Sequence, residues 1–229
     1  AYSTYYEKLK NNKNNSPQPF INKEEKLKSF IFKFPYLLTN IKKINIAAKG
    51  WGIISFVPEK DGIIRRIPSF VEVDNKAYPS FSLELLRVAE KEKEYSFLST
   101  SDGLTNIKLG NLLIPTDKNG RFYLHYQKSN RQQFISFVDV LAEDFDLSLL
   151  REKIIIVGTS AVGLFDIKKT SIGSNFPGVE IHANAVEMIL NQDIPRRPET
   201  IISIEIFSII FISLFCEINI DFPSSISTG

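Results

Sequence analysis

The sequence predicts an α/β protein in which a layered sheet with β-hairpins packs against helices. A short run of β-branched residues at 154–157, closed by a glycine, is typical of a strand that is buried on both faces. A helix is expected at 177–191, shortly after that run. Two further regions, 44–73 and 107–126, carry apolar runs and turn signals that favour β structure. With 229 residues, 43% of them apolar, the chain can bury the core of one or two domains.

The expected strand and helix are joined by a glycine loop and a polar loop. The strand at 154–157 ends at Gly158, and the loop at 158–163 holds glycines, which permit backbone conformations and close approaches that other residues resist. A polar loop is expected at 166–175. Pro177 then opens the helix, at a position where a proline costs no hydrogen bond. We therefore expect this strand, loop and helix in the middle of the α/β layer.

The expected helix at 177–191 carries a wide apolar stripe. Four apolar residues recur at helical spacing, and three more widen the stripe they form. These residues are Ile181, Ala185, Met188 and Ile189, flanked by Val179, Val186 and Leu190. The pattern predicts a mostly buried helix.

The first 40 residues are expected to be a polar linker or the remnant of an upstream part of a domain. Residues 1–29 are polar and hold at most a helix around Thr4–Lys10. The apolar stretch 27–38 is broken by Pro35, which favours a buried loop or a short strand over a helix. The chain begins at Ala1 without a methionine or a signal-like apolar run, so we expect a removed leader or a fragment.

The region 44–73 is expected to hold a hairpin. A strand at 53–57, a turn at 59–62 and a returning strand at 63–73 fit two β-branched runs around an Asp-Gly tip. Pro68 should place the second strand at an edge or cause a bulge.

A helix, a second β region and a short helix are expected next. After a turn at 74–76, a helix should start at Pro79 or Ser80 and continue to about Lys93, with one apolar face. The region 107–126 should hold strands on either side of a turn at 117–120. A short helix at 137–143 then leads back toward the central strand.

Residues 199–220 are expected to form a hydrophobic helix that spans a membrane, followed by a tail at 221–229. A Pro-Arg-Arg-Pro stop at 195–198 separates this helix from the domain expected at 41–195. The apolar run at 201–216 is interrupted only by Ser203, Glu205, Ser208 and Ser213. At about 1.5 Å per residue this run covers roughly 24 Å, which is short of the hydrocarbon core of about 30 Å. A buried or amphipathic C-terminal helix is the alternative.

The composition argues against several classes of protein. The 28 basic and 26 acidic residues give a net charge of +2, which is too even to indicate a nucleic-acid binder. The single cysteine, Cys216, permits no internal disulfide. Two histidines and one cysteine, with no close pairing between the two types, argue against a zinc site. We expect neither a metal nor a cofactor.

Two stretches resemble the CHASE type 2 family, the extracellular sensory domains associated with cyclases and histidine kinases. The more specific one is the block Pro-Gly-Val-Glu-Ile-His-Ala-Asn at 177–184, preceded by Lys153, Gly158, Thr159, Ser160, Gly163 and Asp166. The other holds Gly52, Asp61, Gly62, Arg65, Arg66, Pro68 and the block 78–85, with Asp117, Gly120 and Arg121 further along. The resemblance covers roughly 50–192. The strand-helix units that usually precede it in the family are missing, so the sheet should lack strands.

The resemblance implies an extracytoplasmic sensory module of a protein in the cell membrane, on the periplasmic side in bacteria. It implies no catalysis in this chain and an output domain of the adenylate cyclase, guanylate cyclase or histidine kinase type elsewhere. The expected partners are the membrane, an unknown small-molecule ligand and a second copy of the chain. A structural or dimerisation module without a ligand is the alternative.

The same resemblance points to a candidate ligand-binding site around the glycine loop. Its residues are Thr159, Ser160, Asp166, His182 and Asn184. A carboxylate and an imidazole suit a polar or cationic ligand better than an apolar one. Structural roles are expected for Asp61, Gly62, Arg65, Gly158, Gly163, Pro177 and Gly178. His182 fits either a fully hydrogen-bonded structural histidine or a ligand-sensing or pH-sensing group.

The glycine loop also allows two enzymatic interpretations, a phosphate-binding loop and the nucleophile elbow of a hydrolase. A phosphate-binding loop would need a lysine where the chain has Leu164. Ser160, Asp166 and His182 occur in the order of an α/β-hydrolase triad, but Val162 stands where the nucleophile elbow needs glycine. A serine hydrolase is therefore the third hypothesis. The arginines at 65 and 66 are expected to form solvated ion pairs, which contribute little.

Overall fold

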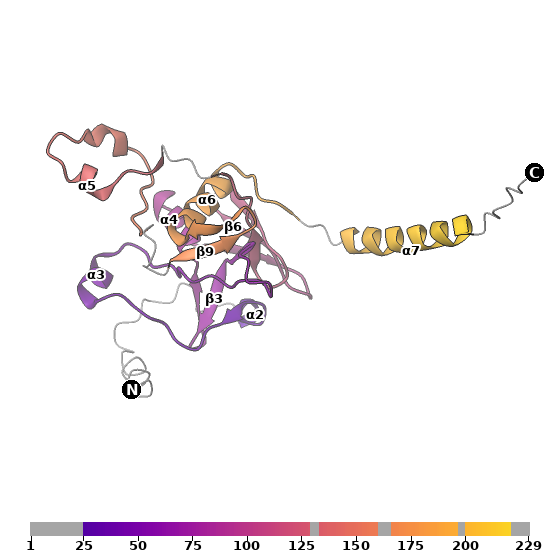
Figure 1. Ribbon diagram of the computed structural model, residues 1–229. Coiled ribbons are helices and arrows are strands. Elements are labelled where there is room, and N and C mark those ends of the chain that lie inside the picture. Colours follow the sequence, from indigo (N-terminus) through magenta and orange to yellow (C-terminus); the bar gives the residue numbers. More distant parts are fainter. Residues whose placement is uncertain (1–24, 129–132, 160–165, 197–199, 221–229) are drawn as a thin grey trace, which may run out of the picture. The chain divides into compact units, whose positions relative to one another are not determined.

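The computed structural model describes residues 25–128, 133–159, 166–196 and 200–220 (Figure 1). Its internal contacts divide the chain into two units, residues 1–195 and residues 196–229, and each is described by itself. The helix expected at Thr4–Lys10 and the loop at 160–165 lie outside the described residues.

The first unit is a mixed α/β structure, as predicted, but its strands form small sheets in place of one layered sheet. Among the described residues there are four sheets, each of two or three strands. Three strands, β1 (Phe32–Lys33), β3 (Phe70–Val73) and β4 (Lys76–Pro79), form one sheet, and β5 (Ser96–Ser99), β6 (Leu104–Leu109) and β7 (Leu112–Pro115) form another. The other two sheets pair β2 (Arg66–Pro68) with β8 (Arg121–Tyr123), and β9 (Ile167–Thr170) with β10 (Gly173–Pro177).

The turn expected at 74–76 is confirmed and joins β3 to β4. Asp74 and Asn75 both have positive φ, at 49° and 61°, which suits the tight turn of a two-residue hairpin loop. On its other side β3 pairs in parallel with β1, within the apolar stretch where a short strand or buried loop was predicted. A single helical turn, α2 (Glu25–Lys28), precedes β1.

The returning strand expected at 63–73 is divided into two strands at Ser69. Before it, β2 pairs with β8, and Pro68 is the last residue of β2 in a two-stranded sheet, where proline is tolerated. After it, β3 belongs to a different sheet. At Ser69, between the two strands, the backbone N–H donates to the carbonyl of Gly120, the residue before β8.

The prediction of a strand at 53–57 is wrong. Only an isolated bridge forms there, between Ile53 and Ser80, and the preceding β structure expected from Ile44 is replaced by the helix α3 (Lys42–Ala47). The Asp-Gly turn itself is present, since the N–H of Glu59 donates to the carbonyl of Ile63. The N–H of Ile53 donates to the carbonyl of Pro79, and its carbonyl accepts from the N–H of Phe81. These backbone groups are therefore not available to pair with a second strand of a hairpin.

The core is built around α4 (Phe81–Ala89) and α6 (Gly178–Leu190), which pack against each other. The α4 helix starts after Ser80 as predicted and ends four residues before Lys93. The α6 helix is confirmed, and its stripe residues Ile181, Ala185, Val186, Met188 and Ile189 are buried. Leu190, predicted to belong to this stripe, is exposed.

The prediction of a central buried strand at 154–157 is wrong. The segment has no strand pairing among the described residues, and Ile154, Ile155 and Val157 are exposed. An apolar sequence favours an extended backbone, but a strand also needs a neighbouring strand, and no described element supplies one. The polar loop expected at 166–175 is also wrong, because this stretch folds into the hairpin β9–β10.

The helix expected at 137–143 is present but short. It is α5 (Phe137–Val140), and a 3₁₀ turn, η3 (Leu147–Leu150), follows it. Neither element has a buried residue.

The second unit is the single helix α7 (Thr200–Ile220), close to the range predicted for it. The prediction that it spans a membrane is not supported. In the described part of the chain, no helix combines the length and the apolar character needed to cross a bilayer.

Candidate functional site

The N-terminus of α6 lies against the ends of the two loops that were predicted to form the site. Gly178, the first residue of the helix, donates its N–H to the carbonyl of Asp166 at 2.8 Å. The Asp166 carboxylate lies so close to Gly178 that a Cβ added there would collide with it. A negative charge is favourable beside the first turn of a helix, where N–H groups are unpaired. The Asp166 carboxylate therefore lies beside the first turn of α6.

Gly158, at the start of the glycine loop, also contacts the first turn of α6. A Cβ added at Gly158 would lie 2.5 Å from Cβ of Val179, so only glycine fits this approach. Gly158 does not have a positive φ, and its role is to let its backbone approach the Val179 side chain closely. Thr159, the next residue, is exposed. Ser160 and Gly163 lie outside the described residues.

His182 is buried in the second turn of α6, and both of its ring nitrogens have partners. Nδ1 lies 2.8 Å from Oγ of Ser82 on α4, and Nε2 lies 3.3 Å from the carbonyl oxygen of Ile54. Because a carbonyl oxygen can only accept, the neutral ring must carry its proton on Nε2. Nδ1 then accepts the hydroxyl proton of Ser82.

The surroundings of His182 keep the ring neutral. Burial lowers its pKa to about 4, against the opposing effects of the Ile54 hydrogen bond and the negative charge of Asp166. Phe56 stacks on the ring with centroids 4.7 Å apart, and Phe81 meets it edge-on at 5.2 Å. Both ring nitrogens are thus bonded to groups of the protein, and two aromatic rings cover the imidazole.

Asn184 holds α6 to the segment that follows β8. Its side-chain Oδ1 accepts the backbone N–H of Gln127 at 3.3 Å, and its Nδ2 donates to the carbonyl of Glu180 at 3.1 Å. Asp166, in turn, forms an ion pair with Lys168 at 3.4 Å. Of the five predicted site residues, Asp166 lies beside the first turn of α6, and His182 and Asn184 lie on the helix itself. Thr159 is exposed and follows Gly158, which contacts Val179 on the helix.

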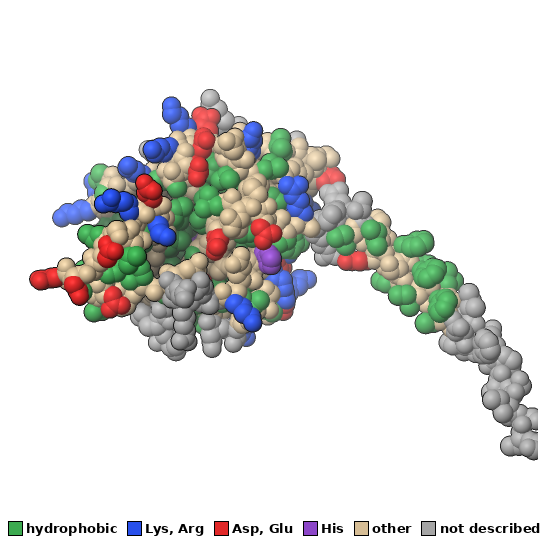
Figure 2. Space-filling model, turned by 90° about the horizontal axis from the view of Figure 1, so that it is seen from above, with side chains coloured by type: hydrophobic (Ala, Val, Ile, Leu, Met, Phe, Trp, Pro, Cys, Tyr) green, Lys and Arg blue, Asp and Glu red, His purple; other side chains and the backbone are tan. Residues whose placement is uncertain are grey.

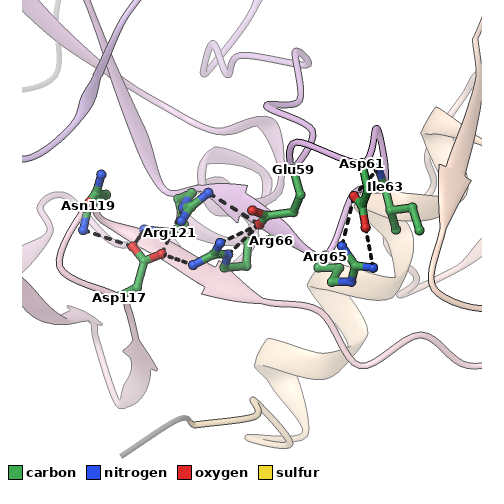
Figure 3. A network of polar contacts seen from close by, with 8 residues as sticks. All are labelled: Glu59, Asp61, Ile63, Arg65, Arg66, Asp117, Asn119 and Arg121. Atoms are coloured by element: carbon green, nitrogen blue, oxygen red, sulfur yellow. Dashed lines mark hydrogen bonds and ion pairs between the residues drawn. The ribbon is translucent and has the colours of Figure 1, made fainter. Parts of the chain in front are cut away.

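A second polar cluster links the Asp-Gly turn to β2 and β8 (Figure 3). Arg66 bonds Oε1 of Glu59 through Nη2 at 2.6 Å and Oδ2 of Asp117 through Nη1 at 2.7 Å. Arg121 reaches the same two acids, at 3.4 Å and 2.9 Å. Two positive and two negative groups are thus shared in one network, whose side chains are only 13–21% exposed.

The network corrects the expectation for Arg66, which was predicted to be a solvated pair. Arg65 does fit that expectation, since its pair with Asp61 is exposed on both sides. The hydrogen bond from Arg65, and next that from the Ile63 N–H, lower the pKa of Asp61. Gly62, at the turn, has a φ of +79°. Arg66 is the first residue of β2, whereas Arg65 precedes the strand, so the two neighbours lie in different environments.

Sequence reasoning missed the groups that enclose His182. Ser82 is 100 residues away from it, and Ile54 is 128 residues away. No local pattern links residues at such separations. Among the described residues, no three His, Cys, Asp or Glu side chains come together in a group that could hold a metal ion.

Comparison with protein-family models gives a match to the CHASE2 domain over residues 6–217. Comparison with curated proteins and with solved structures gives no match.

Proposed function

Because the chain belongs to the CHASE2 domain family, we propose that it is the extracytoplasmic input module of a membrane-associated signalling protein and has no catalytic activity of its own. The family match, which covers most of the chain, carries this proposal. CHASE2 domains are sensory, so the chain is a sensory domain by family. The output domain, of the cyclase or histidine kinase type, would lie outside this sequence.

The proposed ligand site is the surface in front of α6. Asp166 is partly exposed there and Thr159 is exposed, whereas Ser160 lies outside the described residues. The Asp166 carboxylate forms an ion pair with Lys168, and both side chains are partly exposed. A polar ligand with a cationic group can replace Lys168 on that carboxylate. Such exchange of one partner for another costs little, because an exposed pair contributes little.

His182 and Asn184 would act as positioning residues behind this surface. Both hold α6 in place: His182 through Ser82 on α4, and Asn184 through the segment after β8. The backbone N–H of Gly178 donates to the carbonyl of Asp166. A ligand that displaces Asp166 would therefore also displace the first residue of α6. The proposed signal is therefore a shift of α6 relative to α4. A ligand can bias two states only by its differential affinity for them, so the coupling should amount to about 1–3 kcal/mol.

The test is a thermal-shift titration of the full chain with a panel of amino acids and small amines. We expect a saturable rise in melting temperature with at least one of them, and its loss in Asp166→Asn. Asp193→Asn is the matched control, because Asp193 is also an exposed carboxylate, and its Oδ2 lies 3.0 Å from Nδ1 of His125. A shift that survives in Asp166→Asn, or that is lost equally in both variants, contradicts the proposed site.

The proteins purified for the thermal-shift titration also test the hypothesis that the chain is a serine hydrolase. His182, its proposed base, is paired with Ser82 and buried. Esterase and phosphatase assays run beside the titration should show no turnover. Turnover that disappears in Ser160→Ala would replace the sensor proposal with an enzymatic one.

A further inference from the structure

Residues 49–59, here called the strap, lie across the start of α4. The N–H of Ile53 donates to the carbonyl of Pro79 at 2.9 Å, and the N–H of Phe81 donates to the carbonyl of Ile53 at 2.8 Å. A Cβ added at Gly52 would collide with the backbone of Phe81, so this close approach needs glycine. The contacts form an isolated bridge in place of a strand ladder, so few backbone hydrogen bonds hold the middle of the strap.

The middle of the strap covers His182 on α6. The carbonyl oxygen of Ile54 lies 3.3 Å from Nε2 of the imidazole, and the ring of Phe56 stacks on it. The imidazole also meets Ser82 and Phe81 on α4. The strap is therefore the part of this enclosure that can move away without breaking the hydrogen bonds of a helix.

Both ends of the strap are attached to charged side chains. At its start, Gly50 lies against the carboxylate of Glu84, which is paired with Arg87 at 2.6 Å. At its end, the carboxylate of Glu59 bonds Arg66 at 2.6 Å, within the network of Figure 3. Hinges are a few loop positions that absorb backbone rotation, and glycine is well suited to this. The middle of the strap can therefore detach while its ends stay in place.

The closed strap disfavours a proton on His182. Burial lowers the pKa of the ring to about 4, from an ordinary value of 6.5. The groups that touch it from the strap and α4 are uncharged: a carbonyl, a hydroxyl and two aromatic rings. Among the described residues the Asp166 carboxylate acts in favour of the proton, but it is paired with Lys168. On the face in Figure 2, basic and acidic side chains are interspersed, so no field of one sign spans that face. Contact with water is therefore what a charged ring lacks.

We propose that protonation of His182 releases the strap from α6, so that its middle opens to water while both ends stay attached. The hydrated ring of the open form regains its ordinary pKa of 6.5. Between pH 6.5 and pH 4 the open form binds more protons than the closed form, so a fall in pH favours opening. From pH 7.5 to pH 4.5 the ratio of open to closed strap should rise about 70-fold. The inference goes beyond the proposed function, because a proton is a stimulus that needs no ligand at Asp166.

Amide hydrogen exchange of the full chain, resolved to single residues, tests the proposal. The N–H groups of Ile53 and Phe81 bond across the bridge and become free when the strap opens. Ser80 is the internal control, because its N–H donates to Ser69, outside the strap. We expect Ile53 and Phe81 to exchange faster than Ser80 at every pH. After correction for intrinsic exchange rates, their protection should fall about 70-fold from pH 7.5 to pH 4.5.

Two histidine variants assign this pH dependence. His182→Gln should abolish it, because glutamine does not titrate in this range. His125→Gln is the matched control and should keep it: His125 is the other histidine of the chain, and it lies beside Asp193.

A second pair of variants keeps the test decisive if His182→Gln does not fold. Phe56→Leu removes the stacked ring and should lower the protection of Ile53 and Phe81 at pH 7.5, with Ser80 unchanged. Phe97→Leu is its control and should not lower it, because Phe97 is also partly buried against the core but packs on Phe70.

Three results would overturn the proposal. In the first, Ile53 and Phe81 exchange no faster than Ser80, so the strap opens only when the whole chain unfolds. In the second, the pH dependence survives in His182→Gln or is lost in His125→Gln. In the third, Phe97→Leu has the same effect as Phe56→Leu. A chain that binds a ligand at Asp166 but keeps its strap closed at low pH would retain the proposed function and refute this inference.

Discussion

Nδ1 of His182 and Oγ of Ser82 lie 2.8 Å apart and join the two buried helices of the core, α6 and α4. Both side chains are buried. The bond therefore couples the helix that carries the candidate site to the helix behind it. Its energy and its protonation state can both be measured.

Removing the hydroxyl of this pair should destabilise the fold. Ser82→Ala leaves Nδ1 of His182 buried without a donor, which costs about 1–3 kcal/mol in the free energy of unfolding. Ser101→Ala is the control, since Ser101 is exposed and bonds only its neighbour Asp102. Urea unfolding of the two variants should show the larger loss in Ser82→Ala. Equal losses would mean that the buried pair adds nothing.

Stability should fall on mild acidification because of His182. Its pKa is about 4 in the folded chain and 6.5 in the unfolded chain, so the unfolded chain binds more protons between these values. The contribution is fully present above pH 6.5 and is lost as the pH falls toward 4. At pH 5 the loss should be about 2 kcal/mol relative to pH 8.

Chemical unfolding of the wild type and of His182→Gln at several pH values checks this prediction. The difference in unfolding free energy between the two proteins should shrink as the pH falls from 6.5 toward 4. His125 is common to both proteins and cancels in this difference. A difference that does not depend on pH would show that His182 has an ordinary pKa.

A side chain at Gly158 should disturb the fold more than the loss of the Ser160 hydroxyl. Gly158→Val forces a branched side chain into Val179 on α6, and overpacking of this kind costs about 1–3 kcal/mol. Gly173→Val is the matched control, because no atom lies within 4 Å of a Cβ added there. Thermal melts should rank Gly158→Val as the most damaging of the three changes. Ser160→Ala as the worst would defeat this structural role of the loop.

The two neighbouring arginines should respond differently to substitution. Arg66→Met leaves Glu59 and Asp117 with one cation between them in a mostly buried network, which costs about 2 kcal/mol. Arg65→Met removes only the exposed pair with Asp61 and should change stability little. Urea unfolding compares the two variants directly. Similar losses would show that the network in Figure 3 is no stronger than the solvated pair.

Elements whose signals are local could be predicted. The α6 helix follows from a proline start and an apolar stripe, and the turn at Asp74–Asn75 follows from residues that tolerate positive φ. The start of α4 after Ser80 is of the same kind. Helix hydrogen bonds and tight turns join residues within a few positions of each other, so nearby residues suffice to specify them. The family resemblance, confirmed by the match over 6–217, also rests on short blocks of sequence.

Sheet membership and the partners of buried groups were decided by the tertiary structure alone. The strands expected at 53–57 and 154–157 have suitable residues, but a strand exists only where a second backbone lies alongside, and that depends on the path of the whole chain. The placement of Asp166 and Gly158 against α6 depends in the same way on where their loops end. His182 was identified as a candidate from the family resemblance of the block 177–184. Its neutrality, however, comes from burial among residues such as Phe56 and Phe81, and only folding brings its hydrogen-bond partners Ser82 and Ile54 within bonding distance.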